Sequence, residues 1–367
     1  MEIDVAIIGA GPAGSTLAAL LARRGCSVAL IDRDAFPRDK LCGEFLSYDA
    51  LPIVERFGID LRDSPAITRC RVISRHRTYE FDFPQAARGV SRLLLDDLLF
   101  RNAISAGAQP LQSCTVTAVS RDRVQTDRGE IAARVVVGAW GRWGRFDQQL
   151  GRKFVRDRSH RNFGFKRHYR EPRPANRELI ELYSFDRGYL GVSGIENGLT
   201  NICGLVHAMR LAGHKGRWES FVEEIRREEP QLEAMYARYT PAQDDFLSSD
   251  PVIFRGKSAV EQGIFMIGDA SGIIDPLTGS GMAMAIQSAV LVAPFILQAL
   301  AGKRDGAERG YRRRHSDVFA ARIRWSRRVA FLLSRPVLLE AALATRPSPL
   351  FGRFFLRRTR SNLQFEP

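Results

Sequence analysis

Hydrophobic positions in the first 32 residues follow a pattern that predicts a strand, a helix and a second strand. Residues 3–8 and 27–31 are short apolar runs, whereas residues 15–24 are rich in Ala and Leu and contain no Gly or Pro. Strands that are covered on both faces of a parallel sheet have this continuous apolar character. We therefore expect a β-α-β unit at the start of the chain.

Later patterns predict that this sheet continues and that a second sheet is inserted into it. Residues 91–106 have one apolar helical face, residues 115–119, 123–126 and 131–137 predict short strands, and residues 263–267 resume the buried strand pattern. Alternation predicts a hairpin over residues 69–83 and strands over 162–169, 179–185, 189–195 and 200–207, followed by a helix over 218–239. The predicted fold class is α/β with an inserted antiparallel sheet.

The turn after the first strand has the spacing of a dinucleotide-binding motif. It reads Gly9-Ala10-Gly11-Pro12-Ala13-Gly14, and the next strand ends at Asp32. Gly9 permits the tight turn, Gly11 lets a pyrophosphate approach the backbone, and Gly14 lets the helix pack close to the strand. The helix N-terminus offers N–H groups to the phosphates, and the carboxylate of Asp32 accepts hydrogen bonds from a ribose. The first domain is therefore predicted to be of the Rossmann type.

The net charge of +14 lies almost entirely near the C-terminus. Residues 303–360 contain sixteen Lys or Arg and four Asp or Glu, a balance of +12. An anionic membrane surface, an acidic partner or a solvated surface all suit such a tail. We expect no nucleic acid, because no recognition motif accompanies the charge. The uncharged residues 280–301 are long enough to span a bilayer, but Pro and Gln within them favour a buried helix.

The five cysteines form no metal-site or CxxC spacing. This pattern favours a reducing, cytoplasmic location, with peripheral contact at a membrane through the basic tail as an extension of that expectation.

A second glycine-rich stretch allows the chain to be compared with a known family. Gly263-Ile264-Phe265-Met266-Ile267-Gly268-Asp269-Ala270 is followed by Asp275-Pro276-Leu277-Thr278-Gly279-Ser280-Gly281-Met282. Together with the N-terminal motif, residues 1–305 resemble the FAD-dependent oxidoreductases of the geranylgeranyl reductase and aromatic hydroxylase superfamily. The resemblance implies that Gly268 and Asp269 bind the cofactor and that Asp269 hydrogen-bonds its ribityl chain. It also places a loop of Pro276, Gly279, Ser280, Gly281 and Met282 under the isoalloxazine ring.

The resemblance implies three regions. The FAD-binding domain would comprise residues 1–66, 85–150 and 251–305, and the substrate domain residues 67–84 and 151–250. A helical, basic C-terminal region would follow over residues 306–367.

Further residues match the family outside the two glycine motifs. Lys40-Leu41-Cys42-Gly43-Glu44 resembles the KxCGG or KxCGE signature of the geranylgeranyl reductase branch, which lies beside the flavin. Arg33 begins the stretch that we expect over the cofactor. Arg92 matches an arginine that contacts the cofactor, and Val116 matches a backbone position that binds adenine.

The chain also departs from the family pattern. Trp140 stands where the family usually carries an aspartate linked to FAD and NADPH binding. This exchange puts direct reduction by NADPH in doubt, although NADPH or NADH is retained as a candidate transient electron donor. The sequence contains no WxWxIP segment, which argues against a flavin halogenase.

The leading hypothesis is an FAD-dependent oxidoreductase that transfers a hydride at a carbon–carbon bond of a hydrophobic isoprenoid, lipid or polyketide-like substrate. Cys42, Tyr189 and His168 are the candidate catalytic residues. Lys166 and Tyr169, like His168 and Tyr189, lie on predicted strands of the roofing sheet and could face the ring. Two alternatives stay open at this point. One is a flavin-dependent monooxygenase of an aromatic or polyketide substrate, and the other is a degenerate flavoprotein with a binding role at a membrane.

Overall fold

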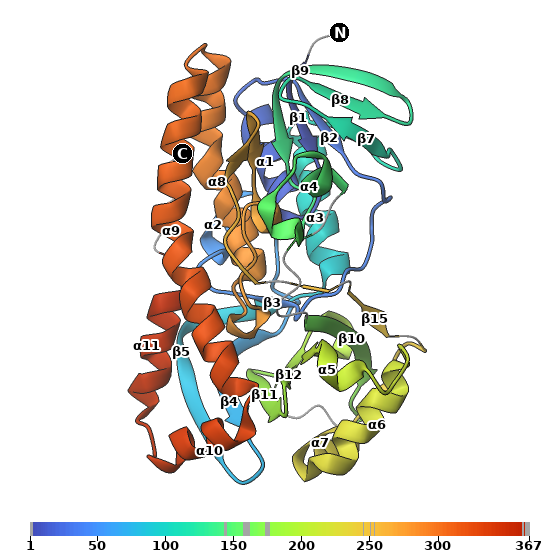
Figure 1. The fold of residues 1–367 in the computed structure, drawn as a ribbon, viewed down its shortest axis with the longest axis vertical. Helices are drawn as coiled ribbons and strands as arrows, with labels where there is room; N and C mark the ends of the chain where they lie inside the picture. The colour runs from blue at the N-terminus through green and yellow to red at the C-terminus, as the bar shows by residue number, and fades with distance from the viewer. Residues whose placement is uncertain are drawn as a thin grey trace.

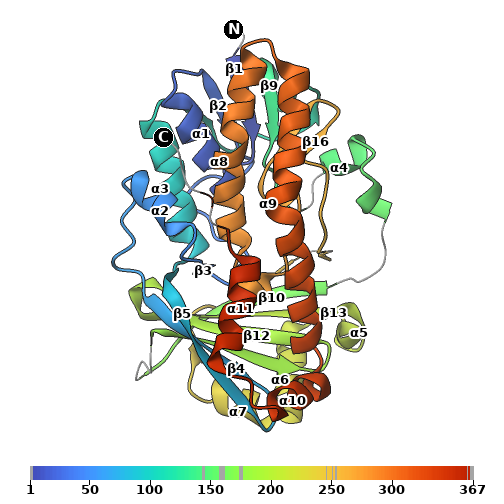
Figure 2. The same ribbon diagram turned by 90° about the vertical axis from the view of Figure 1, so that its left-hand side faces the viewer.

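The computed structural model describes residues 3–142, 145–156, 162–172, 177–244, 246–249, 251–252, 254–361 and 363. Two sheets lie one above the other along the long axis of the molecule (Figures 1 and 2). Helix α8 (Gly281–Leu300) runs beside the upper sheet, and helix α9 (Arg304–Leu333) runs beside both. The chain is a mixed α/β protein, as the sequence predicts.

The upper sheet contains the predicted N-terminal β-α-β unit. Its central strands follow the order β16-β17-β9-β1-β2-β6, and β1 pairs in parallel with both β2 and β9. β7 and β8 extend β9 as an antiparallel flap. The strands are β1 (Ile3–Ile8), β2 (Val28–Ile31), β6 (Gln109–Leu111), β7 (Val116–Val119), β8 (Arg123–Thr126), β9 (Gly129–Gly138), β16 (Val260–Glu261) and β17 (Ile264–Met266).

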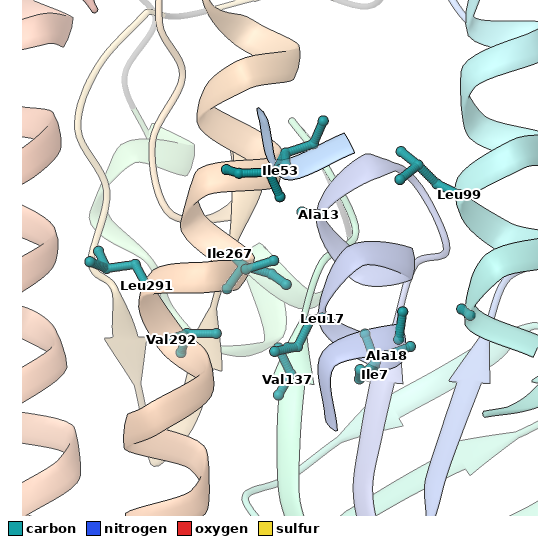
Figure 3. Close-up of a cluster of buried hydrophobic side chains, with 14 of the residues drawn as sticks. Ile7, Ala13, Leu17, Ala18, Ile53, Leu99, Val137, Ile267, Leu291 and Val292 are labelled. Carbon is teal, nitrogen blue, oxygen red and sulfur yellow. The ribbon is translucent and has the colours of Figure 1, made fainter. Parts of the chain in front are cut away.

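Helices α1 (Pro12–Ala22), α3 (Arg92–Ser105) and α8 (Gly281–Leu300) cover one face of this sheet. Figure 3 shows Leu17 of α1 and Val292 of α8 converging on Ile7 and Val137 of the strands. α8 is long and apolar enough to cross a bilayer. It instead packs along α1 and α9, as the core helix that the sequence predicted. The short helices α2 (Leu51–Arg56) and α4 (Arg145–Gln149) lie at the margins of this half.

The lower sheet holds the predicted substrate-domain strands. Its order is β14-β10-β13-β12-β11-β4-β5-β3, with β15 beside β10. Its strands are β3 (Phe45–Leu46), β4 (Ala66–Ile73), β5 (Thr78–Gly89), β10 (Asn162–Arg170), β11 (Leu179–Phe185), β12 (Gly188–Gly194), β13 (Leu199–His207), β14 (Thr240–Pro241) and β15 (Leu247–Ser248).

Two details of this sheet differ from the prediction. β11 pairs in parallel with β4, so the sheet is mixed and not wholly antiparallel. The predicted helix over residues 218–239 is two helices, α6 (Trp218–Glu228) and α7 (Pro230–Tyr236). Pro230 cannot continue α6 because it lacks an N–H and restricts the preceding residue, Glu229, to an extended conformation. Both helices pack on the lower face of the sheet, and the short helix α5 (Ala208–Leu211) follows β13.

The basic C-terminal region is helical, as predicted, but its first helix begins earlier. α9 (Arg304–Leu333) is followed by α10 (Pro336–Ala344) and α11 (Pro349–Thr359). Tyr311 and Phe319 of α9 belong to the core of the upper half, whereas Ala330 and Leu333 pack with Tyr189 on the lower sheet. α9 therefore ties the two halves together, and α11 lies against β5 (Figure 2).

Candidate active site

A cavity of about 2130 Å³ lies between the two sheets and reaches from the glycine turn after β1 to α10 and α11. Exposed lining residues include Arg33 at one end and Leu350 at the other, together with Ser248 and Pro276. The cavity therefore opens at a nucleotide end and at a C-terminal end.

The glycine turn forms the floor of the nucleotide end. Gly9, Gly11, Pro12 and Ala13 line the cavity, and Gly9 has a φ of 106° that favours glycine. Gly14 lies outside the lining, but a Cβ placed there would lie 1.8 Å from the carbonyl oxygen of Gly9. α1 thus starts directly beside β1, and no side chain caps its N-terminus. The N–H groups at this N-terminus are available to an anion.

Asp32 lies at the end of β2 and lines the same part of the cavity. One carboxylate oxygen accepts hydrogen bonds from the Ala10 amide at 2.7 Å and from Arg38 at 3.1 Å. These contacts fix the carboxylate and leave lone pairs for a ribose hydroxyl. Arg33 is 75% exposed at the rim, and Lys40 lines the cavity while its ammonium donates to Asp34 at 2.6 Å.

Arg92 places a positive charge over the glycine turn. Its guanidinium makes two hydrogen bonds of 2.6 Å with Asp96, and a Cβ on Gly11 would lie 3.7 Å from its Nη2 atom. Burial alone would lower the pKa of Arg92, but the charge of Asp96 outweighs it and raises the pKa. Arg92 therefore remains a cation where a pyrophosphate would approach Gly11.

Asp269 and the loop after it line the middle of the cavity. Burial raises the pKa of Asp269, and the charges of Arg142, Lys257 and Arg92 partly offset this effect. Its carboxylate accepts no hydrogen bond from the described residues, so it is free to accept one from a ligand hydroxyl. Gly268 lies beside it in the cavity wall.

The loop predicted to lie under the ring presents most of its residues to the cavity. Pro276, Gly279, Gly281 and Met282 line the wall, and Gly279 has a φ of 61°. Ser280 points away from the cavity, where its hydroxyl contacts Arg360 and donates to the Thr359 carbonyl. The C-terminal end of α11 thus supports this loop from behind.

Val116 and Trp140 complete the nucleotide end. Val116 lines the cavity, and its carbonyl accepts a hydrogen bond from Arg145. The indole of Trp140 folds back against Gly138 and packs at a tilt against the Phe146 ring. Its buried Nε1–H has no partner among the described residues. An unsatisfied buried donor is costly, and a bound ligand with acceptor oxygens would satisfy it.

These features fit FAD. The α1 N-terminus and Arg92 suit a pyrophosphate, whereas Asp32 and Asp269 suit the hydroxyls of a ribose and a ribityl chain. When bound, FAD would supply the redox chemistry of the site.

A buried polar network lies next to the Lys40–Glu44 segment. Glu44 is fully buried, and its two carboxylate oxygens bond Lys166 at 2.6 Å and His168 at 2.7 Å. Lys166 also donates to Asp39 at 2.7 Å. Burial opposes the charge of Lys166, but the two carboxylates outweigh it and raise its pKa. This ammonium lies between the carboxylates of Asp39 and Glu44, which together with His168 bring their ligand atoms within 4.8 Å of one another.

The candidate catalytic residues do not all reach the cavity. Cys42 and Tyr189 line it. His168 does not line the cavity, but its ring is hydrogen-bonded to the carboxylate of Glu44, which does. Tyr169 is on the opposite face of β10, where it packs against Tyr236, so the expectation that it could face the ring is wrong. Adjacent strand residues point to opposite faces, which separates Tyr169 from His168.

Cys42 and Tyr189 both retain their protons at neutral pH. Burial raises the pKa of the Cys42 thiol and of the Tyr189 hydroxyl, and the charge of Asp275 raises the latter further. Tyr189 donates a hydrogen bond of 2.8 Å to Asp275. Cys203, on the neighbouring strand, also lines the cavity, and burial raises its pKa to about 12.

The C-terminal half of the cavity is strongly apolar. Its wall combines the upper face of the lower sheet with α9, α10 and α11. Its apolar lining includes Val72, Tyr79, Phe81, Phe83, Ile180, Leu182, Leu205, Leu332, Leu339, Ala342, Leu343, Leu350, Phe351, Phe354 and Phe355. The alternation of Tyr79, Phe81 and Phe83 was visible in the sequence, but it gave no sign that the C-terminal helices would cover these rings.

The fold and the site define a flavoprotein: a Rossmann-type domain, a roofing sheet and a cavity with the groups that FAD requires. The sequence matches the family described as FAD binding domain over residues 2–80 and 107–323, and the chain belongs to this family. It is an FAD-dependent oxidoreductase.

Similar proteins catalyse several reactions. A menaquinone reductase of Mycobacterium tuberculosis is 28% identical over 318 residues, which cover 80% of this chain and 76% of the relative. A tryptophan 2-halogenase of Chondromyces crocatus is 24% identical, with 89% and 67% covered. Digeranylgeranylglycerophospholipid reductase 2 of Methanopyrus kandleri is 24% identical, with 86% and 82% covered.

Among solved structures, the flavin-dependent brominase Bmp2 superposes with a TM-score of 0.78 at 21% identity. The match covers 98% of this chain and 93% of that one. This likeness supports the fold and does not select among reductase, monooxygenase and halogenase chemistry.

Proposed function

We propose that this chain is an FAD-dependent reductase that saturates a carbon–carbon double bond in an isoprenoid or similar lipid. The observation that carries the proposal is the apolar half of the cavity, which continues from the FAD site to an opening beside Leu350. A long hydrocarbon chain would bury its surface there, and each buried CH₂ group contributes about 0.8 kcal/mol.

The few polar groups of the wall suit such a substrate. Leu182 and Leu205 form an apolar surface with Tyr189 on the lower sheet, and Leu339 and Leu343 of α10 pack in the same cluster. A pocket lined in this way discriminates by shape and length more than by hydrogen bonding. It therefore favours a flexible alkene over a compact polar aromatic substrate.

Saturation of a double bond requires a hydride and a proton. Bound FAD in its reduced form would supply the hydride. Cys42 and Tyr189 line the cavity and keep their protons at neutral pH, so either can donate a proton to the second carbon. The Glu44–Lys166–His168 network holds the Cys42 segment in place, because the Glu44 amide also donates to the Cys42 sulfur at 3.4 Å.

Two of the similar proteins support this choice by their names. Menaquinone carries an isoprenoid tail, and the digeranylgeranylglycerophospholipid is an isoprenoid lipid. Both relatives are reductases, and both align with more than three quarters of this chain.

The test is an anaerobic turnover of the FAD-loaded protein. The flavin is reduced with dithionite and mixed with a menaquinone in detergent, and air is admitted before mass spectrometry. Air reoxidises a quinol ring but not a saturated tail, so a persistent gain of two hydrogen atoms is expected. In a separate turnover under labelled dioxygen, incorporation of the label into the product would instead identify a monooxygenase. If no electron donor reduces the bound flavin, or if no lipid reoxidises the reduced flavin, the protein has only a binding role.

A further inference from the structure

We propose that the end of α9, all of α10 and most of α11 form a docking surface for an anionic lipid bilayer, and that the cavity opens into this surface. The docking surface is defined as residues 331–358. The claim that substrate enters here rests on the proposed function, whereas the claim of bilayer binding does not.

Exposed apolar side chains are concentrated on the docking surface. Nine large hydrophobic side chains are exposed among the described residues, and six of them lie between residues 331 and 354. They are Phe331, Val337, Leu338, Leu350, Phe351 and Phe354. Val337, at 81%, is the most exposed of the nine. Water-soluble surfaces seldom gather so many apolar groups in one place unless they contact a partner or a membrane.

The charge of the same segment favours anionic lipid as that partner. Five exposed arginines and a single acid, Glu340, lie within residues 331–358. Glu340 is engaged by the turn between β4 and β5, where it accepts hydrogen bonds from Ser74 and the His76 amide and pairs with Arg77. The outward charge of this surface is therefore positive, which attracts it to an anionic bilayer.

Aromatic and basic side chains alternate here as they do at a membrane interface. The Arg335 guanidinium lies 3.5 Å from the centre of the Phe331 ring, and that of Arg358 lies 5.2 Å from the Phe354 ring. An arginine held in this way can place its charge among headgroups while the ring enters the acyl boundary.

The cavity meets the surface within this segment. Thr345, Ser348 and Leu350 both line the cavity and are exposed to solvent. Figures 1 and 2 show α10 and the start of α11 at the end of the molecule opposite the N-terminus, so a bilayer could reach them without contacting the nucleotide end. A lipid tail could then pass from the bilayer into the cavity without crossing water.

The experiment measures vesicle binding without any substrate. FAD-loaded protein is sedimented with vesicles of phosphatidylcholine mixed with phosphatidylglycerol, and with phosphatidylcholine alone. We expect binding to the mixed vesicles only, and at least about a tenfold loss of binding for the double variant Val337→Glu, Leu338→Glu. Neither residue lines the cavity. Met209→Glu is the matched control, because Met209 is 64% exposed on α5, outside the docking surface.

Sedimentation velocity and substrate turnover separate the remaining outcomes. If the wild-type protein does not bind the vesicles and is a dimer, whereas the double variant is a monomer, a second copy covers this surface and the proposal is overturned. Equal binding by wild type and double variant would also overturn it. Turnover in detergent should be unchanged in the double variant, so a failure of the reductase assay is distinguishable from a failure of vesicle binding.

Discussion

The buried carboxyl of Asp275 holds the catalytic candidate Tyr189 in position and also makes the stability of the fold depend on pH. Its Oδ1 atom accepts hydrogen bonds from the Tyr189 hydroxyl at 2.8 Å and from the Leu277 amide at 3.1 Å. Burial nevertheless raises the pKa of Asp275 to about 6. The folded state therefore prefers the protonated acid, and ionisation at neutral pH destabilises the fold.

The direction of this effect predicts the behaviour of Asp275→Asn. Between the unfolded pKa of 3.8 and the folded value of about 6, the native state binds a proton that the unfolded state lacks. Stability from this group is thus lost as the pH rises through that window, by about 3 kcal/mol. The asparagine oxygen can still accept from Tyr189. The free energy of unfolding of Asp275→Asn relative to wild type should therefore rise by about this amount from pH ~4 to pH ~7.

Urea unfolding at the two pH values checks this prediction. Burial lowers the pKa of His315 to about 4, which makes the fold lose stability as the pH falls from 6.5. Both proteins contain His315, so its effect cancels in the difference between them. If the free energies of unfolding of Asp275→Asn and wild type differ by the same amount at both pH values, Asp275 does not titrate in this way.

Gly14 tests the contact between α1 and β1. Gly14→Ala would place a Cβ 1.8 Å from the Gly9 carbonyl oxygen, so the helix must move away from the strand. We expect a loss of about 1–3 kcal/mol in stability and at least about a tenfold weaker FAD affinity, because the phosphate-binding N–H groups move with the helix. Fluorescence titration of the apoprotein with FAD measures the affinity.

Gly306→Ala is the matched control for Gly14→Ala. Gly306 lies near the start of α9, is exposed and has open space where a Cβ would be added. Alanine there should stabilise the helix by about 0.5–1 kcal/mol and leave FAD affinity unchanged. An unchanged FAD affinity in Gly14→Ala as well would contradict the role assigned to this contact.

At the scale of elements, α11 is held on β5 by a tyrosine and a glycine. The Tyr79 hydroxyl donates to the Ser348 carbonyl at 2.9 Å and accepts from the Gly352 amide at 2.8 Å. Gly352 lies so close to the Phe81 ring that an added Cβ would meet it at 2.4 Å. These contacts hold the helix that closes the apolar half of the cavity.

Tyr79→Phe should loosen α11 without unfolding the protein. The change removes two hydrogen bonds of about 1 kcal/mol each, so amide exchange in the first turns of α11 should accelerate by about tenfold or more. Hydrogen-exchange mass spectrometry of this segment measures the effect. Tyr239→Phe, which loses a contact to Arg238 far from α11, should leave that exchange unchanged. Identical protection of α11 in Tyr79→Phe would show that packing alone holds the helix.

The sequence predicted an element correctly where local apolar periodicity alone determines whether a segment is a strand or a helix. The β-α-β unit and the strands β10 to β13 follow local apolar periodicity, and all are confirmed. Pairing depends on distant segments, so the parallel contact between β11 and β4 was not predictable from either strand. Likewise, Glu44 was visible as part of a motif, but its burial against Lys166 and His168 depends on the packing of two domains.

At the scale of the whole molecule, α9 packs on both sheets and forms one wall of the cavity between them. Its first half completes the core of the upper sheet, and its last turns pack beside Tyr189 and Leu205. The chain after it then covers the far half of the cavity and returns Arg360 to the loop at Ser280. The C-terminal region, predicted as a separate basic tail, is therefore a wall of the candidate active site.

The most direct measurement of the central claim is a comparison of Ala342→Trp with Ala341→Trp. Both residues lie on α10, but only Ala342 lines the cavity, whereas Ala341 is exposed. Tryptophan at 342 should lower kcat/KM for reduction of the isoprenoid tail by at least about tenfold, which corresponds to about 1.4 kcal/mol, and tryptophan at 341 should not. FAD content should equal wild type in both variants. Equal tail reduction by both variants would contradict a substrate path between the lower sheet and α10.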